Sequence, residues 1–372
     1  MTTLRSRAVL DPAPPPAEAA PRAESRRPAR DPWFDNVKMA LVTLVVVGHA
    51  WTLLPQNVST SWAYDFLYAW HVPAFVVVTG YLSRSFAWTA TKLWSLVRTV
   101  AVPYLLFEAV LAWFRYQVGG VQLDDLFTNP HWPMWYLSAL FFWRLMAPVF
   151  LAVPRPIALV VAVATSLAAG LWAGDTLDVA RIFGLLPFFV LGLTLHEPQW
   201  ARVRTRRAIP WALLGVAVVV VFTRFTDSWI ATEWYYYRAR YDVLDPNDLK
   251  AAAIRSVLLC VGLIGAASAF ALVPRRRSWF STLGAATLVV YLFHGFFVLA
   301  AQYEGFPEWA ADRPALSFTL TTVAAVALSL ALAAPPVARV LNVTVDPVGR
   351  LAGRGRARLR RGRSTPPAGE RR

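Results

Sequence analysis

The chain of 372 residues is 57% hydrophobic and only 16% charged, and its mean hydropathy is +0.44. This composition excludes a soluble, collagen-like, coiled-coil or disordered chain and predicts an all-α polytopic membrane protein of the cell membrane. A net charge of +15 would suit nucleic acid, but the Lys and Arg residues cluster between apolar segments and near the two ends, so no nucleic-acid partner is expected.

The chain divides into a membrane domain between two basic tails. Residues 1–32 are rich in Pro, Ala and Arg, lack a signal-peptide core and predict a disordered tail, and residues 341–372 repeat this character. A helix needs about 20 apolar residues to cross a bilayer, and ten segments within 33–340 are long enough. They are 37–54, 64–82, 96–114, 134–152, 156–173, 179–196, 208–224, 252–272, 284–302 and 316–334.

The charges of the loops predict the orientation. Cytoplasmic loops of membrane proteins are rich in Lys and Arg, and with the N-terminus inside every basic loop falls on the cytoplasmic side. Both termini are therefore predicted to be cytoplasmic. The mixed segment 225–250, with its WYYYRARY stretch, is expected to cap a cavity that faces outward.

Ionisable side chains inside a span are expensive, so each of them is a candidate for function. His49 lies in the first span and His71 in the second, and imidazole, whose pKa is about 6.5 in model peptides, is well suited to take a proton from a hydroxyl. Arg144 needs an internal partner or a water-filled cavity, and Glu108 is a candidate counter-ion. Cys260 lies in an apolar run and is expected to be buried and inert, and no metal site is expected.

A basic residue and a histidine share the first span. Lys38 precedes His49 by eleven positions, which is about 16 Å along a helix axis. A cation near the inner surface and a base within the membrane suit a long donor that carries phosphate. Arg98 and the basic run 275–277 are further candidate anion contacts.

Four ordered motifs resemble the integral-membrane acyltransferases of the acyltransferase-3 type, within it the fucose 4-O-acetylase branch. They are FDNVKMALVTLVVVGHA, HVPAFVVVTGYLSR, MWYLSALFFWRL and LGAATLVVYLFHGFF, and the resemblance covers residues 33–335. Three positions depart from the family pattern: Lys38 replaces the common Arg, Thr79 the usual Ser, and an Arg-x-x-Arg motif is reduced to Arg98.

The resemblance implies transfer of an acyl group, usually acetyl, from cytoplasmic acyl-CoA to a hydroxyl of a glycan, lipid-linked sugar or small natural product. Acetyl-CoA or another acyl-CoA is then a co-substrate, and no permanently bound cofactor is expected. We expect His49 to be the general base, supported by Asp35 or His71, with Lys38 and Arg98 on the donor phosphates. Further pocket candidates are Glu108, Trp135, Tyr136, Arg144, Tyr291 and His294. From composition alone a transporter or flippase stays possible, since buried charges also line translocation paths.

Overall fold

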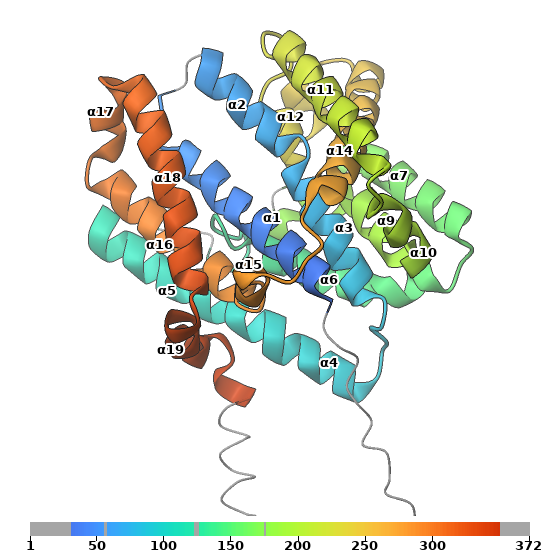
Figure 1. The fold of residues 1–372 in the computed structure, drawn as a ribbon, viewed down its shortest axis with the longest axis horizontal. Helices are drawn as coiled ribbons and strands as arrows, with labels where there is room; N and C mark the ends of the chain where they lie inside the picture. The colour runs from blue at the N-terminus through green and yellow to red at the C-terminus, as the bar shows by residue number, and fades with distance from the viewer. Residues whose placement is uncertain (1–30, 56–57, 123–125, 175, 350–372) are drawn as a thin grey trace, which may run out of the picture. The chain divides into compact units, whose positions relative to one another are not determined.

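Helices account for the secondary structure of this computed structural model, which describes residues 31–55, 58–122, 126–174 and 176–349 (Figure 1). No strand occurs in these ranges, so the all-α prediction is confirmed for them. The longer helices are α1 (Pro32–Trp51), α2 (Val58–Tyr68), α3 (His71–Ser83), α5 (Val102–Gly119), α6 (Trp135–Leu151), α7 (Arg155–Trp172), α11 (Ala208–Thr226), α14 (Asp248–Leu272), α16 (Thr287–Tyr303), α18 (Pro314–Ala333) and α19 (Pro335–Val345). The shorter elements are α4 (Ala90–Leu96), the π-helix η1 (Val97–Ala101), the 3-10 helix η2 (Thr176–Asp178), α8 (Val179–Gly184), α9 (Leu186–Thr194), α10 (Glu197–Val203), α12 (Glu233–Tyr236), α13 (Tyr241–Leu244), α15 (Trp279–Leu283) and α17 (Phe306–Ala311).

The helices make the chain a multi-pass membrane protein. Among the described residues, six helical stretches are long and apolar enough to cross a bilayer, and a pair of helices bent by 56° would be a seventh. The six are Ser61–Ser83, Ala90–Gly119, Arg155–Trp172, Ala208–Thr226, Asp248–Leu272 and Pro314–Ala333, and the bent pair is Thr176–Gly184 with Leu186–Thr194. Helices also occupy the other predicted segments, but α6 and α16 have only 17 residues each. The count of ten and the cytoplasmic position of both ends stay predictions.

Apolar side chains on the outside of the bundle are the signature of a lipid-facing surface. Trp211 and Phe225 on α11 are 73% and 76% exposed. Lipid tails are as apolar as these side chains, so such residues need no protein partner. Cys260 on α14 is likewise exposed, which makes the expectation that it is buried wrong. An apolar run inside a membrane protein does not tell which of its faces is covered by protein.

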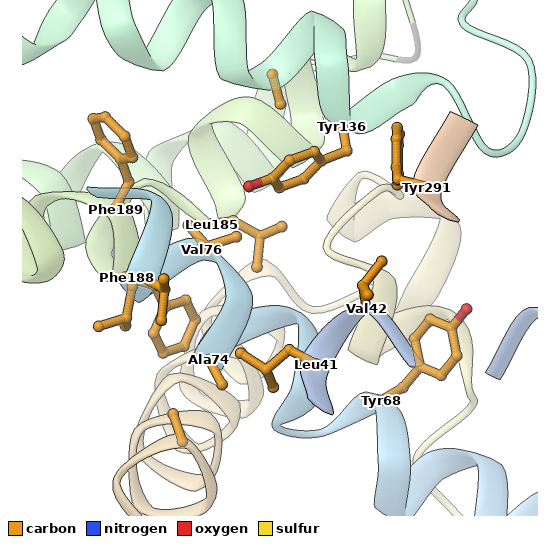
Figure 2. Close-up of a cluster of buried hydrophobic side chains, with 14 of the residues drawn as sticks. Leu41, Val42, Tyr68, Ala74, Val76, Tyr136, Leu185, Phe188, Phe189 and Tyr291 are labelled. Carbon is orange, nitrogen blue, oxygen red and sulfur yellow. The ribbon is translucent and has the colours of Figure 1, made fainter. Parts of the chain in front are cut away.

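The core of the bundle is built around α1 and α3. α1 contacts α3, α16 and α18, while α3 also packs against α9 and α14. Side chains from α1, α3, α6 and α16 meet in one buried cluster, in which Val42, Val76, Tyr136 and Tyr291 take part (Figure 2). The two helices that carry His49 and His71 are therefore held by neighbours on several sides.

Glycines allow α3 and α9 to approach closely. A Cβ atom added at Gly80 would lie 2.1 Å from the carbonyl oxygen of Phe189, and one added at Gly192 would lie 2.0 Å from that of Val77. Small residues at such crossings let helix backbones pack tightly in a membrane, where lipid supplies no hydrophobic drive for association. This contact fixes α3 against α9.

The predicted tails lie mostly outside the described residues, which begin at 31 and end at 349. The compact unit begins at Pro32, where α1 starts. At the other end α19 continues to Val345, beyond the predicted tail boundary at 341.

Candidate active site

A cavity of about 210 Å³ lies among α1, α2, α3, α6, α8, α16 and segment 235–238. His49 and His71 line it, together with aromatic and basic side chains. The lining residues are Val45, His49, Thr52, Tyr64, Tyr68, His71, Val72, Phe75, Trp132, Trp135, Tyr136, Arg181, Tyr235, Tyr236, Arg238 and Tyr291. The described residues of this lining include two guanidinium groups and no carboxylate.

His49 belongs to the last turn of α1, two residues before Trp51, and thus lies nearer the helix end than segment 37–54 predicted. Gly48, the residue before His49, lets the Tyr68 ring pack closely against α1, because a Cβ atom at position 48 would lie 3.0 Å from that ring. The Trp132 ring covers His49 from another side, with 4.4 Å between ring centroids. The imidazole is 5% exposed and still reaches the cavity.

A hydrogen-bond chain determines which nitrogen of His49 carries the proton. The Nδ1 atom of His294 lies 2.7 Å from the carbonyl oxygen of Tyr291, and a carbonyl can only accept, so this Nδ1 carries hydrogen. In neutral His294 the Nε2 atom is then an acceptor. It lies 2.8 Å from His49 Nδ1, which must therefore donate. The lone pair of a neutral His49 is left on Nε2, which makes no hydrogen bond among the described residues. An imidazole nitrogen with a free lone pair is able to take a proton from a hydroxyl group.

His71 presents a second imidazole to the same cavity. Its Nδ1 atom donates to the carbonyl oxygen of Leu67 at 2.8 Å, one turn earlier in the chain, which leaves Nε2 as the acceptor in the neutral ring. The Tyr68 ring packs edge-on against it, with 4.7 Å between centroids. No hydrogen bond joins His71 to His49 within the described ranges. Each histidine thus offers the cavity its own acceptor nitrogen.

The segment 131–133 is tied to two helices and carries Trp132 to the site. Glu108 on α5 is completely buried, and its Oε1 accepts from His131 Nδ1 at 2.5 Å and from the His131 backbone N–H at 2.9 Å. Tyr291 on α16 donates to the carbonyl oxygen of Pro133. These bonds hold the segment against the His49 side of the cavity.

Tyrosines make much of the remaining wall. Tyr136 hydrogen-bonds Thr79, so α6 and α3 are joined beside the cavity. Tyr236 donates to the Tyr64 hydroxyl at 2.9 Å, which links segment 225–250 to α2. Burial raises the pKa of Tyr235 to about 12 and also raises the pKa of Tyr236. Both phenols therefore stay neutral and able to donate hydrogen bonds.

Six of the eleven predicted site residues come together at this cavity. His49, His71, Trp135, Tyr136 and Tyr291 line it, and His294 lies directly behind His49. The other five lie elsewhere. Asp35 pairs with Lys38 at 2.8 Å near the start of α1, three turns or more from His49. Arg98 on η1 lies 3.5 Å from the carboxylate of Asp346, so Lys38 and Arg98 each already have a carboxylate beside them.

The suggested ion pair between Glu108 and Arg144 does not form. Glu108 is occupied by His131, while the Arg144 Nε atom lies 3.4 Å from the Ser83 hydroxyl. His131, which precedes α6, binds Glu108 through both its ring and its backbone N–H. Arg144 does not line the His49 cavity and lies in a separate pocket.

Several lining residues were not singled out from the sequence. Arg181 is an ionisable residue inside segment 179–196 and meets the criterion that drew attention to Arg144; it pairs with Asp178 at 3.3 Å and lies over the Trp135 ring at 4.8 Å. Tyr64 and Tyr68 lie four residues apart, on one helix face, which is a usable signal. Trp132 has no signal beyond its position next to His131.

Comparisons with known proteins agree with this architecture. The family described as "Acyltransferase domain" (acyltransferase-3) matches residues 31–334. Nodulation protein NolL of Mesorhizobium japonicum is 25% identical over 334 residues, which cover 82% of this chain and 86% of the relative. No solved structure matches the chain.

Proposed function

The chain belongs to the acyltransferase-3 family, an assignment that makes it a membrane acyltransferase, and from this premise we propose an O-acyltransferase that uses acyl-CoA. The proposed donor is acetyl-CoA, and the proposed acceptor is a hydroxyl of a glycan, lipid-linked sugar or small natural product, as in the fucose 4-O-acetylase branch that the motifs resemble. Under this proposal the acceptor hydroxyl enters the cavity beside His49.

The proposed reaction is a direct transfer. His49 Nε2 takes the proton of the acceptor hydroxyl while the oxygen of that hydroxyl attacks the thioester carbonyl carbon. A carbon–oxygen bond forms, the carbon–sulfur bond breaks, and the departing thiolate takes the proton from the His49 imidazolium. His294 stabilises that imidazolium because its Nε2 accepts from His49 Nδ1. His71 is proposed to accept a hydrogen bond from a neighbouring hydroxyl of the acceptor.

The observation that carries the proposal is the ordered hydrogen-bond chain from the Tyr291 carbonyl through His294 to His49. It leaves the basic nitrogen of His49 without a hydrogen-bond partner in the described part of the chain, at the wall of a cavity. One nitrogen of His49 therefore joins α1 to α16, and the other is available to a molecule in the cavity. The tyrosine-rich wall supports an acceptor with hydroxyl groups, since neutral phenols both donate and accept hydrogen bonds.

The test is transfer of label from acetyl-CoA in reconstituted protein. Purified full-length chain in lipid nanodiscs is incubated with acetyl-labelled acetyl-CoA and a panel of glycans and lipid-linked sugars. The proposal predicts labelled acceptor and free CoA in equal amounts. If another labelled acyl-CoA is used and acetyl-CoA is not, the acetyl assignment fails. If the chain consumes no thioester with any acceptor, the CoA-dependent reaction is rejected.

A further inference from the structure

A second pocket, separate from the His49 cavity, contains two cationic side chains. It has a volume of about 150 Å³ and lies between the end of α3, the segment 84–89, α4 and α6. Its polar lining consists of Arg144, Lys92 and the hydroxyls of Ser83, Ser85 and Ser95. Among the described residues no Asp or Glu forms an ion pair with Arg144 or Lys92.

The charge of Arg144 requires an explanation. Its side chain is half-buried within an apolar helix, and its only hydrogen bond among the described residues is the 3.4 Å contact from Nε to the Ser83 hydroxyl. The carboxylate that could have neutralised it, Glu108, is held by His131. A cation inside a membrane protein normally has a counter-charge or water. The two terminal nitrogens of the guanidinium make no hydrogen bond within the described ranges and are available to an anionic ligand.

The polar groups of the pocket suit phosphate. A guanidinium binds two phosphate oxygens side by side, an ammonium adds a point charge, and hydroxyls donate to the remaining oxygens. Neighbouring contacts fix this arrangement: Trp88 donates to the carbonyl oxygen of Leu145 at 3.0 Å and ties segment 84–89 to α6. Thr89 accepts from the backbone N–H of Lys92 at 3.4 Å and caps α4.

The pocket and the His49 cavity lie along one seam between α3 and α6. Thr79 contacts Tyr136 at the cavity, and one turn further along α3 Ser83 contacts Arg144. Tyr136 and Arg144 lie eight positions apart on α6, which is about 12 Å along the axis. An extended chain advances about 1.2 Å per bond, so an arm of about ten bonds or more can join the two places.

We propose that Arg144, Lys92 and the hydroxyls of Ser83, Ser85 and Ser95 form a phosphate-binding site. The phosphate has two possible sources: the nucleotide end of a CoA-type donor, which rests on the proposed function, or the headgroup of an anionic lipid. The predicted orientation puts the segment 84–92 on the cytoplasmic side, where both sources are present.

Binding measurements on the full-length chain test the site. The variants are Arg144→Gln and Lys92→Gln, with Arg206→Gln as the matched control, an exposed arginine in a loop assigned to the same side. In neutral nanodiscs of phosphatidylcholine, CoA affinity is measured by calorimetry. We expect a loss of about tenfold or more for each pocket variant and none for Arg206→Gln. Arg144→Lys keeps the positive charge but loses the planar guanidinium, so its affinity for CoA is expected to lie between that of the wild type and that of Arg144→Gln.

A second arm identifies the source of the phosphate. Thermal midpoints are compared in nanodiscs with and without phosphatidylglycerol. A stabilisation by this lipid that Arg144→Gln and Lys92→Gln remove, with CoA affinity unchanged, assigns the site to a lipid headgroup. The site is rejected if both variants match the wild type in CoA affinity and in lipid stabilisation. Lys92 is exposed, so its variant keeps the test decisive if Arg144→Gln does not fold. Because binding is read without turnover, the result is independent of whether His49 is the base.

Discussion

Replacing His294 with Leu should slow acyl transfer without weakening donor binding. The change removes the acceptor 2.8 Å from His49 Nδ1 and leaves that N–H without a partner in a buried place. A hydrogen bond to a charged group contributes about 1.5–3 kcal/mol, and the bond becomes charge-assisted when His49 takes up a proton. Since 1.36 kcal/mol corresponds to about tenfold in rate, we expect kcat to fall by about 10- to 100-fold.

The assay is labelled-acetyl transfer in nanodiscs at saturating acetyl-CoA, with the thermal midpoint as a check on folding. His294→Gln keeps a carbonyl acceptor on a side chain of similar reach and should recover most of the rate. His196→Leu, at an exposed histidine away from the cavity, is the matched control. The reasoning is refuted if His294→Leu turns over at the wild-type rate, or if His294→Gln is as slow as His294→Leu.

Three further predictions follow from other parts of the structure. Glu108→Gln weakens both bonds to His131, so Trp132 is held less firmly and kcat/KM for the acceptor should fall about tenfold; unchanged kinetics would separate this segment from the site. Gly80→Ala puts a Cβ 2.1 Å from a backbone oxygen, where ordinary contact begins at 3.4 Å, and should lower the free energy of unfolding by about 1–3 kcal/mol in detergent denaturation. Gly174→Ala adds a Cβ in open space and should leave the stability unchanged; equal denaturation midpoints for the two variants would contradict the close packing of α3 on α9. Hydrogen bonds from Lys250 and the backbone of Asn247 lower the pKa of Asp245, so the stabilisation that its carboxylate gives is complete above the unfolded pKa of about 3.9 and is lost as pH falls through the lower folded pKa. Below about pH 3.9, hydrogen exchange of segment 241–250 should rise in the wild type but not in Asp245→Asn. Identical pH profiles of the two proteins would argue against this role of Asp245.

The apolar segments were predictable because a membrane imposes a simple rule of length and hydropathy. Each predicted segment is largely helical, and the motifs around His49, His71, Tyr136 and His294 indicated residues that the fold does bring together. Length and hydropathy do not tell which face of a helix contacts lipid and which contacts other helices, since lipid and protein interior are equally apolar. This is why Cys260, expected to be buried, is exposed.

The partners of the buried charges were not predictable from spacing. His49 and His294 are 245 positions apart and meet only through the packing of α1 against α16. Arg98 lies beside Asp346, which belongs to the part of the chain predicted to be a tail. The sequence does not show that segment 131–133 lies against α5, and therefore Glu108 was assigned to Arg144. In the structure the Glu108 carboxylate binds His131, and Arg144 lines a separate pocket.

The most direct test of the central claim compares catalysis and donor binding in His49→Ala. Purified variant and wild type are reconstituted in nanodiscs, and acetyl transfer and the Kd for CoA are measured on the same samples. The account predicts that transfer is abolished while CoA binds as in the wild type, because the base and the phosphate contacts are different groups. Full transfer activity in folded His49→Ala would remove His49 from the mechanism and contradict the account.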